Sequence, residues 1–209
     1  MPKPSATARA RKIKLILFDV DGVLTDGKIW IFPAPGPQSG VQQSVLEKSA
    51  QYGGQGGFGF QSASLIEAKG FHAHDGTAIS LARLAGIKTG IITKRISETV
   101  ALRARDLKID HVYQGIQDKA SVLAQILDKD GITAAEAAFV GDDVIDLPAM
   151  RQCGLAVAVK NARPEVKAEA HWATAHAGGA GAARDAVEYI LKAQGKWKKA
   201  VEEYISERS

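Results

Sequence analysis

Short apolar runs alternate with longer amphipathic segments along most of the chain. Apolar runs bounded by polar or turn-forming residues, as expected of buried strands, occupy residues 13–18, 87–93, 111–113, 137–140, 156–159 and 171–173. Helices are predicted between them at residues 77–85, 97–107, 119–129, 146–152, 164–168 and 183–207, the last broken near Gly195. Strands that alternate with helices predict an α/β fold, a Rossmann-like parallel sheet with helices on both faces and right-handed crossovers.

The alternation stops between the first two predicted strands. Residues 28–31 favour one strand of a small β-hairpin and residues 65–73 its return strand, while residues 32–64 are rich in Gly, Pro, Gln and Ser, as flexible loops are. Within that stretch, residues 41–52 favour a helix. For the whole chain we predict a flexible tail at residues 1–12, one domain at 13–195 and a helical tail at 196–209. The domain contains a flexible insertion at 32–64, which we expect to loop outward from the hairpin tip.

Polar residues gather where the predicted strands end. Asp19 and Asp21 follow the first strand, and the alternation of side chains along a strand puts both on one face. Thr93 ends the second strand, Lys119 follows the third, and the acidic run at residues 142–146 follows the fourth. The carboxyl ends of parallel strands open on one crevice where ligands bind, so we expect these side chains to meet.

The residue types at these strand ends suit the hydrolysis of a phosphate ester. A carboxylate with an ordinary pKa of about 3.9 is anionic at neutral pH, so Asp19 can attack phosphorus and form an aspartyl-phosphate. Asp21 is placed to protonate the leaving alkoxide and then to activate the water that releases phosphate. Thr93 and Lys119 would donate to the phosphoryl oxygens. Because two anions and a phosphate repel one another, we expect a divalent cation, and Mg²⁺ suits an all-oxygen site.

Length, composition and charge narrow the class of protein. A chain of 209 residues suits one hydrophobic core, and the single Cys153 excludes an internal disulfide. The sequence holds no apolar run near the roughly 20 residues that span a bilayer and no apolar leader, so we expect a cytoplasmic protein with no membrane partner. The net charge of +4 comes largely from basic residues near both ends, without a nucleic-acid-binding motif, so we expect no nucleic-acid partner.

The strand-end motifs, in this order, resemble those of the haloacid dehalogenase superfamily of phosphatases. A finer resemblance, over residues 14–194, is to the 3-deoxy-D-manno-octulosonate 8-phosphate phosphatases, which lack a large cap domain; it is carried by FDVDGVLTDGKIW, HDGTAISLARLAGIKTGIITKR, VYQGIQDK, FVGDDVIDLPAM, GLAVAV and GGAGAARDAVEYILKAQGKW. The resemblance implies a Mg²⁺-dependent phosphomonoesterase for a small phosphosugar acid of lipopolysaccharide biosynthesis, that octulosonate or a related nonulosonate 9-phosphate. It also implies only a short turn where this chain has residues 32–64.

The same resemblance implies a role for each acid of the site. The Asp19 carboxylate, the Asp21 backbone carbonyl and Asp142 would bind Mg²⁺. Asp143 and Asp146 would orient these ligands through metal-bound waters and through Lys119. The simpler alternative for Asp142 is an N-cap on the following helix.

The substrate-binding positions match the family pattern less well. Arg95 and Arg103 correspond to basic positions near the site, and Arg184 is retained beside the Gly-rich tail, which in the family reaches a neighbouring subunit's site. We predict that these three arginines and Lys94 bind the substrate. Three positions depart from the pattern: Lys94 in place of Gly, His74 in place of the Arg before Asp-Gly, and Ala180 in place of an Arg of the tail.

The resemblance also implies a homotetramer, in which the hairpins pack against one another and shield the next subunit's site. Both hairpin strands are present in this sequence, so we predict the same assembly.

Two other classes of protein stay open. Receiver domains also take phosphate on an Asp at a strand end, but their acceptor stands alone at a middle strand, whereas here the acidic pair and the acidic run lie at the first and fourth strands. The second alternative is a phosphatase-like interaction module with little turnover. The three departures from the family pattern and the insertion keep this alternative open, because a fold alone does not determine whether a protein is active.

Overall fold

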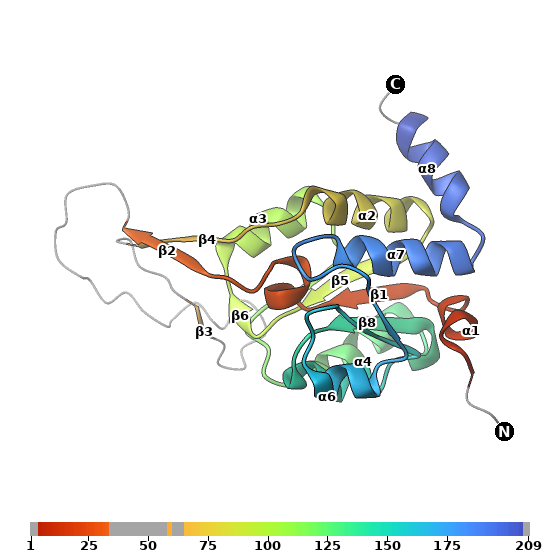
Figure 1. The fold of residues 1–209 in the computed structure, drawn as a ribbon, viewed down its shortest axis with the longest axis horizontal. Helices are drawn as coiled ribbons and strands as arrows, with labels where there is room; N and C mark the ends of the chain where they lie inside the picture. Colours follow the sequence, from red (N-terminus) through yellow and green to blue (C-terminus); the bar gives the residue numbers. More distant parts are fainter. Residues whose placement is uncertain (1–3, 34–57, 60–64, 207–209) are drawn as a thin grey trace.

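A six-stranded parallel sheet forms the centre of the protein, in a computed structural model that describes residues 4–33, 58–59 and 65–206 (Figure 1). Its strands, in spatial order, are β10 (Trp172–Ala173), β9 (Leu155–Ala158), β8 (Ala137–Gly141), β1 (Leu15–Phe18), β5 (Lys88–Ile92) and β7 (His111–Tyr113). Every residue of β1, β8 and β9 is buried, which explains why these strands are continuous apolar runs in the sequence. The predicted α/β fold is confirmed.

Helices cover both faces of this sheet. α2 (Ala73–Leu84), α3 (Glu98–Asp106) and α7 (Ala182–Ala193) lie on one face, α4 (Lys119–Asp130) and α6 (Pro164–Glu169) lie on the other, and the short α5 (Leu147–Met150) packs against α4 (Figure 1). The sheet and the inner faces of the helices bury one core that includes Phe18, Phe139 and Ile190. In the described part of the chain, no helix is both long enough and apolar enough to cross a membrane.

The start of α2 differs from the prediction. The return strand of the hairpin ends at Ala68, and α2 begins at Ala73, inside the segment predicted as strand. Asp75 in the first turn suits the N-terminus of a helix. Gly76 fits the same turn because a Cβ there would lie 2.4 Å from a guanidinium nitrogen of Arg103.

The N-terminal segment also differs from the prediction. Where a flexible tail was predicted at residues 1–12, the structure has a helix, α1 (Ala6–Ala10), capped by the Ser5 hydroxyl, which accepts a hydrogen bond of 3.2 Å from the Ala8 N–H. Ala10 is fully buried, and the hydroxyls of Thr7 and Tyr189 lie 3.0 Å apart. A good cap and small buried side chains let this short helix form on the surface of α7.

At the other end, the predicted helix break is confirmed. Gly195 has a positive φ of 69° and separates α7 from α8 (Trp197–Ser206). α8 packs against α2 and projects from the body of the molecule (Figure 1).

The predicted hairpin is present beyond the carboxyl edge of the sheet. β2 (Trp30–Pro33) and β4 (Leu65–Ala68) pair antiparallel and project from that edge (Figure 1). The predicted helix at residues 41–52 and most of the insertion lie outside the described residues. Two residues of the insertion, β3 (Phe58–Gly59), pair with β6 (Arg95–Ile96), so this part does not loop outward from the hairpin tip as predicted.

Candidate active site

The turn after β1 positions the first two acids. Phe18 pairs with Ile91 of β5 and Val140 of β8, so the residues that follow these three strands meet at one edge of the sheet. The chain then makes a kinked turn, η1 (Val20–Leu24), in which Asp21 and Gly22 have non-helical backbone angles. Gly22 in this turn has a φ of +93°, and a Cβ there would lie 2.2 Å from Oδ2 of Asp142. A glycine is therefore required for the turn after Asp19 to approach the acidic loop.

A buried lysine joins two of the acids. Lys119 Nζ lies 2.8 Å from Oδ1 of Asp19 and 2.7 Å from Oδ1 of Asp146, and Lys119 is 2% exposed. Lys119 is the first residue of α4, whose N-cap Asp118 accepts a hydrogen bond of 3.1 Å from the Ser121 N–H. A buried ammonium between two carboxylates keeps its charge because both partners compensate its desolvation.

Asp146 organises the loop after β8. Its Oδ2 accepts hydrogen bonds from the backbone N–H groups of Asp142 (3.0 Å) and Asp143 (3.3 Å). Asp143 caps the short helix η4 (Val144–Asp146), since its Oδ1 accepts a hydrogen bond of 2.7 Å from the Val144 N–H. The capping role considered for Asp142 therefore belongs to Asp143. Among the described residues, Oδ1 of Asp142 is buried without a hydrogen-bond partner.

Burial and mutual repulsion shift the pKa values of these acids. Burial raises the pKa of Asp19 to about 6, against the opposing charge of Lys119. Burial also raises the pKa of Asp142 to about 7, and the charges of Asp19 and Asp146 add to the effect. Burial opposes the charge of Lys119, but the two carboxylates beside it raise its pKa above the ordinary value. Asp19, Asp142 and Asp146 together thus hold more negative charge than Lys119 compensates.

Three of the acids are close enough together to share a cation. One oxygen from each of Asp19, Asp142 and Asp146 lies within 4.8 Å of the others. Both oxygens of Asp146 are already engaged, one by Lys119 and one by backbone N–H groups. Asp19 and the unpartnered Asp142 oxygen are therefore the carboxylates with free capacity for a hard cation such as Mg²⁺.

A cleft of about 330 Å³ opens over these residues. It brings together most of the predicted site, and its lining residues are Asp19, Asp21, Thr93, Lys94, Arg95, Asp142, Asp143 and Ile145. Lys119 and Asp146 lie behind this surface, 2% and 0% exposed. The convergence of strand ends expected from the sequence is thus present in the structure.

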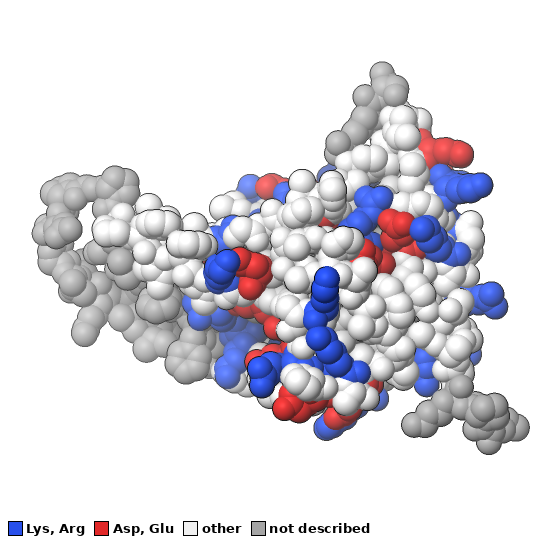
Figure 2. Space-filling model, in the orientation of Figure 1, with Lys and Arg blue, Asp and Glu red and all other residues white. Residues whose placement is uncertain are grey.

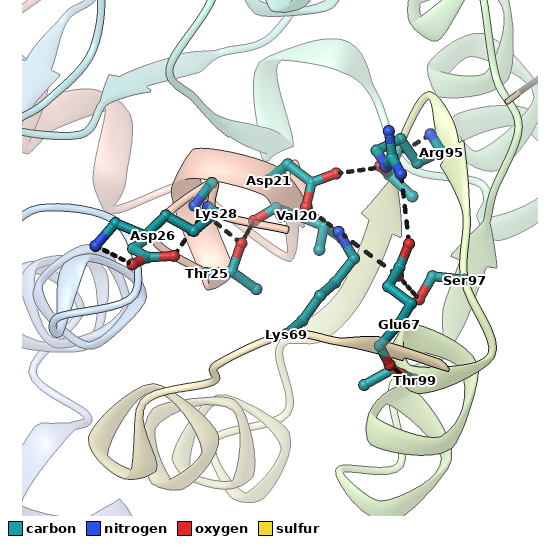
Figure 3. A network of polar contacts seen from close by, with 12 residues as sticks. Val20, Asp21, Thr25, Asp26, Lys28, Glu67, Lys69, Arg95, Ser97 and Thr99 are labelled. Carbon is teal, nitrogen blue, oxygen red and sulfur yellow. Dashed lines mark hydrogen bonds and ion pairs between the residues drawn. The ribbon is translucent and has the colours of Figure 1, made fainter. Parts of the chain in front are cut away.

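Asp21 belongs to a charge network that the sequence analysis missed (Figure 3). Lys69 Nζ contacts Oδ1 of Asp21, and Arg95 Nε lies 3.7 Å from Oδ2. Glu67 joins the two cations, 3.3 Å from Arg95 and 3.9 Å from Lys69, and its Oε1 accepts a hydrogen bond of 2.6 Å from the Ser97 hydroxyl. The available signal was the alternation of Glu67 and Lys69 with apolar neighbours in the return strand, which puts both on one face.

Two predicted substrate-binding residues lie outside the cleft of this chain. The Arg103 guanidinium lies 5.9 Å from the Phe71 ring, in a separate small pocket between α2 and α3. The Arg184 guanidinium lies 4.7 Å from the Trp197 ring, and its Nε donates a hydrogen bond of 3.1 Å to Glu188. Within one chain, both arginines make structural contacts.

The Gly-rich tail packs against the turn after β1 of its own chain. A Cβ on Gly178 would lie 1.8 Å from the backbone oxygen of Gly22. Asn161 connects the two segments, donating a hydrogen bond of 3.2 Å to the Gly22 carbonyl and accepting one of 2.7 Å from the Gly178 N–H. The tail therefore supports the turn that carries Asp21.

Comparison with known proteins agrees with this geometry. A family of haloacid dehalogenase-like hydrolases matches residues 85–184. The 3-deoxy-D-manno-octulosonate 8-phosphate phosphatase of Escherichia coli K12 is 36% identical over 193 residues, which cover 92% of this chain and 87% of that protein. The chain belongs to the haloacid dehalogenase-like hydrolases. Within them it is a phosphatase, as its curated relatives are.

Solved structures of similar proteins share the whole fold. The 3-deoxy-D-manno-octulosonate 8-phosphate phosphatase of Yersinia pestis superposes with a TM-score of 0.75 at 34% identity, over 92% of this chain and 88% of that one. The Moraxella catarrhalis phosphatase, solved with a magnesium ion, a phosphate ion and a KDO molecule, gives a TM-score of 0.77 at 32% identity, over 95% of this chain and 97% of that one.

Proposed function

We propose that the protein is a Mg²⁺-dependent phosphomonoesterase that hydrolyses 3-deoxy-D-manno-octulosonate 8-phosphate through an aspartyl-phosphate on Asp19. One observation carries the proposal: the buried carboxylate of Asp19 lies at the floor of a cleft, in contact with Lys119 and next to Asp142, whose Oδ1 has no hydrogen-bond partner among the described residues. The identity and coverage of the curated relatives support the phosphosugar acid as the substrate.

In the proposed mechanism, the chain supplies nucleophile, proton and charge. A carboxylate oxygen of Asp19 attacks phosphorus while Asp21 gives a proton to the departing sugar oxygen. Asp21 then takes a proton from the water that cleaves the aspartyl-phosphate. Lys119 holds Asp19 in place, and Thr93 and Lys119 offer donors to the phosphoryl oxygens as charge spreads in the transition state.

The residues present fit the metal that the mechanism requires. Asp19, the backbone carbonyl of Asp21 and Asp142 would hold Mg²⁺, and Asp146 and Asp143 would keep the acidic loop in place. A bound Mg²⁺ supplies positive charge that lowers the repulsion between the carboxylates and a phosphate. The buried, unpartnered Oδ1 of Asp142 is the observation that favours this assignment.

We expect Mg²⁺ to stabilise the protein more above neutral pH than below it. Without metal, the folded state keeps protons on Asp19 and Asp142 up to pKa values of about 6 and about 7, whereas the unfolded state loses them near 3.8. The stability that these groups contribute is therefore lost as the pH rises from about 4 to about 7. Mg²⁺ must displace the same protons, so it binds best above that range.

Thermal unfolding with EDTA or with Mg²⁺ checks this expectation. At a free concentration of about 100 times its Kd, Mg²⁺ adds about 2.7 kcal/mol to the free energy of unfolding. We expect a clear rise in melting temperature near pH 8 and little near pH 5.5, with no rise at either pH in the Asp142→Asn variant. If Mg²⁺ raises the melting temperature of the native chain equally at both pH values, the assignment of Asp19 and Asp142 as metal ligands is contradicted.

A panel of phosphorylated sugar acids tests the substrate. We expect kcat/KM to be highest for the octulosonate 8-phosphate, for which the curated relatives are named, with a nonulosonate 9-phosphate next, because Lys94 and Arg95 at the cleft offer positive charge to either sugar acid. A preference for the nonulosonate would reassign the substrate and leave the chemistry intact. Absence of turnover on every member, and on an aryl phosphate, would instead favour the interaction module.

We also infer a homotetramer held together by the hairpins. Trp30, Ile31, Phe32 and Ile66 are large apolar residues that are 54%, 43%, 48% and 45% exposed. Figure 2 shows the described part of the hairpin as a mostly uncharged surface beside the charged body. Apolar residues gathered on a projecting element are typical of an interface between proteins.

Light scattering of a hairpin variant tests the assembly. We expect the native chain to have the mass of a tetramer and the Phe32→Lys variant to have a lower mass, because a buried charge at the interface is costly. Leu102→Lys, at a residue that is 51% exposed on α3, is the matched control and is expected to leave the mass unchanged. Deleting residues 35–57 keeps both hairpin strands and β3, and is expected to preserve the assembly. A monomeric native chain at micromolar concentration would refute the inference.

A further inference from the structure

Lys69 holds one oxygen of Asp21, and the other oxygen lies 3.7 Å from Arg95 Nε without a hydrogen bond among the described residues. We propose that Lys69 is a positioning residue that fixes the Asp21 carboxyl for proton transfer to the leaving group, an inference that rests on the proposed function. Lys69 Nζ contacts Oδ1 of Asp21, while Oδ2, which is buried, makes no hydrogen bond among the described residues. Figure 3 shows the two cations, Lys69 and Arg95, on different oxygens of the same carboxyl group.

Lys69 acts from behind the carboxyl group and not from the cleft. Its side chain is 0% exposed, and among the described residues it does not contribute to the lining of the cleft. Arg95, by contrast, lines the cleft and is 24% exposed. A lysine that substrate does not reach contributes by holding another residue, whereas Arg95 is available to an anionic ligand.

Lys69 is itself held firmly. Glu67, two residues earlier on the same face of the chain, lies 3.9 Å from its Nζ. Ser97 donates a hydrogen bond of 2.6 Å to the Glu67 carboxylate, and Thr99 donates one of 3.4 Å to the Glu67 carbonyl. These contacts fix the end of β4 against the start of α3. A fully buried ammonium requires such fixed partners, so its position is defined.

The proton moves to and from Oδ2 of Asp21, the oxygen that Lys69 does not contact. In the first step, the bond from Asp19 to phosphorus forms, the bond from phosphorus to the sugar oxygen breaks, and that oxygen takes its proton from Oδ2 of Asp21. In the second step, a water proton moves to the same oxygen of Asp21 as the water oxygen attacks phosphorus and the bond to Asp19 breaks. Throughout, Lys69 donates to Oδ1 and prevents the carboxyl group from rotating away.

The dependence of the rate on the leaving group tests this role. Para-nitrophenolate leaves without a proton, whereas the alkoxide of glycerol phosphate requires one, so only the alkyl ester depends on a well-placed Asp21. General acid–base catalysis contributes about 10²- to 10⁴-fold. We expect Lys69→Met, in the full-length Mg²⁺-loaded protein, to lose at least about tenfold more kcat/KM on glycerol phosphate than on para-nitrophenyl phosphate.

Three controls separate positioning from other effects. Lys28→Met, on a lysine whose side chain is 70% exposed near the start of the same hairpin, is expected to leave the ratio of the two rates unchanged. The double variant of Lys69→Met with Asp21→Asn is expected to lose no more kcat/KM on the alkyl ester than Asp21→Asn alone. The two changes remove the same interaction, the contact between Lys69 and Asp21. Lys69→Gln keeps a donor for Oδ1, so it is expected to retain more of the alkyl rate, and it carries the test if the Met variant does not fold.

The outcomes are distinguishable. Equal losses on the two esters for both folded variants would show that Lys69 is only structural and would overturn the proposal. An additive loss in the double variant would overturn it as well. If the native protein hydrolyses neither ester and none of the phosphorylated sugar acids, the proposed function itself fails.

Discussion

The Asp19→Asn variant is expected to hydrolyse no phosphomonoester at a measurable rate. An amide is a poor nucleophile toward phosphorus, and removing a catalytic nucleophile costs about 10⁴-fold or more in kcat. The fold should persist because Asn has nearly the same shape. Burial raises the pKa of Asp19 to about 6, so removing its charge should leave the metal-free protein as stable as before, or more stable, above that pH.

Steady-state assays and acid-quenched phosphoenzyme trapping check this result together. The native protein should retain phosphate after a quench, and Asp19→Asn should retain none. Asp26→Asn is a matched control in the same segment, since Asp26 is exposed and interacts with Lys28. Undiminished activity in purified Asp19→Asn would exclude Asp19 as the nucleophile. Phosphate retained by the variant after the quench would show that another residue accepts the phosphoryl group.

The Lys119→Ala variant is expected to lose both rate and stability. Loss of one preorganised donor to a developing charge lowers kcat by roughly 10²-fold or more. Lys119 is also the cation that lies between Asp19 and Asp146, and removing one partner of a buried ion pair costs about 3–5 kcal/mol. Mg²⁺ should restore part of the stability, because it compensates the same carboxylates, but should not restore the rate.

Urea unfolding and kcat measurements on the same preparations check this expectation. Lys119→Met fills more of the space of the lysine and should show the same loss of rate with a smaller loss of stability. Lys129→Ala, at an exposed position near the end of the same helix, should change neither quantity. A change in kcat below about threefold would place Lys119 outside the reacting centre.

The acids of the cleft could be found from sequence because of how parallel sheets are built. A strand that is buried on both faces leaves a continuous apolar run, and the polar residues that follow it must lie at the sheet's edge. Asp19, Thr93 and Asp142 follow such runs and lie in one cleft. The core of the fold and these three site residues could therefore be predicted from local sequence patterns.

The residues that were missed, and those that lie outside the cleft of their own chain, depend on contacts between distant segments. Lys69 meets Asp21 across 48 residues, and the alternation that puts Lys69 on one face of the return strand does not indicate which distant residue it contacts. Arg103 and Arg184 were assigned by position in a motif, but packing against the rings of Phe71 and Trp197 takes both side chains away from the cleft of their own chain. A family motif fixes the backbone position of a residue, whereas the direction of a long side chain depends on its neighbours.

The strand order has a consequence for how the chain folds during its synthesis. β1, the strand that precedes Asp19, is made early, yet its two neighbours in the sheet are β5 and β8, and β8 ends only at Gly141. Pairings between distant segments form slowly and leave apolar surface exposed until they are complete. A growing chain that has not reached β8 therefore carries a strand of four apolar residues with one edge unpaired. We expect nascent chains that stop before β8 to depend on chaperones, and chains that extend past Gly141 to become resistant to proteases around the future active site.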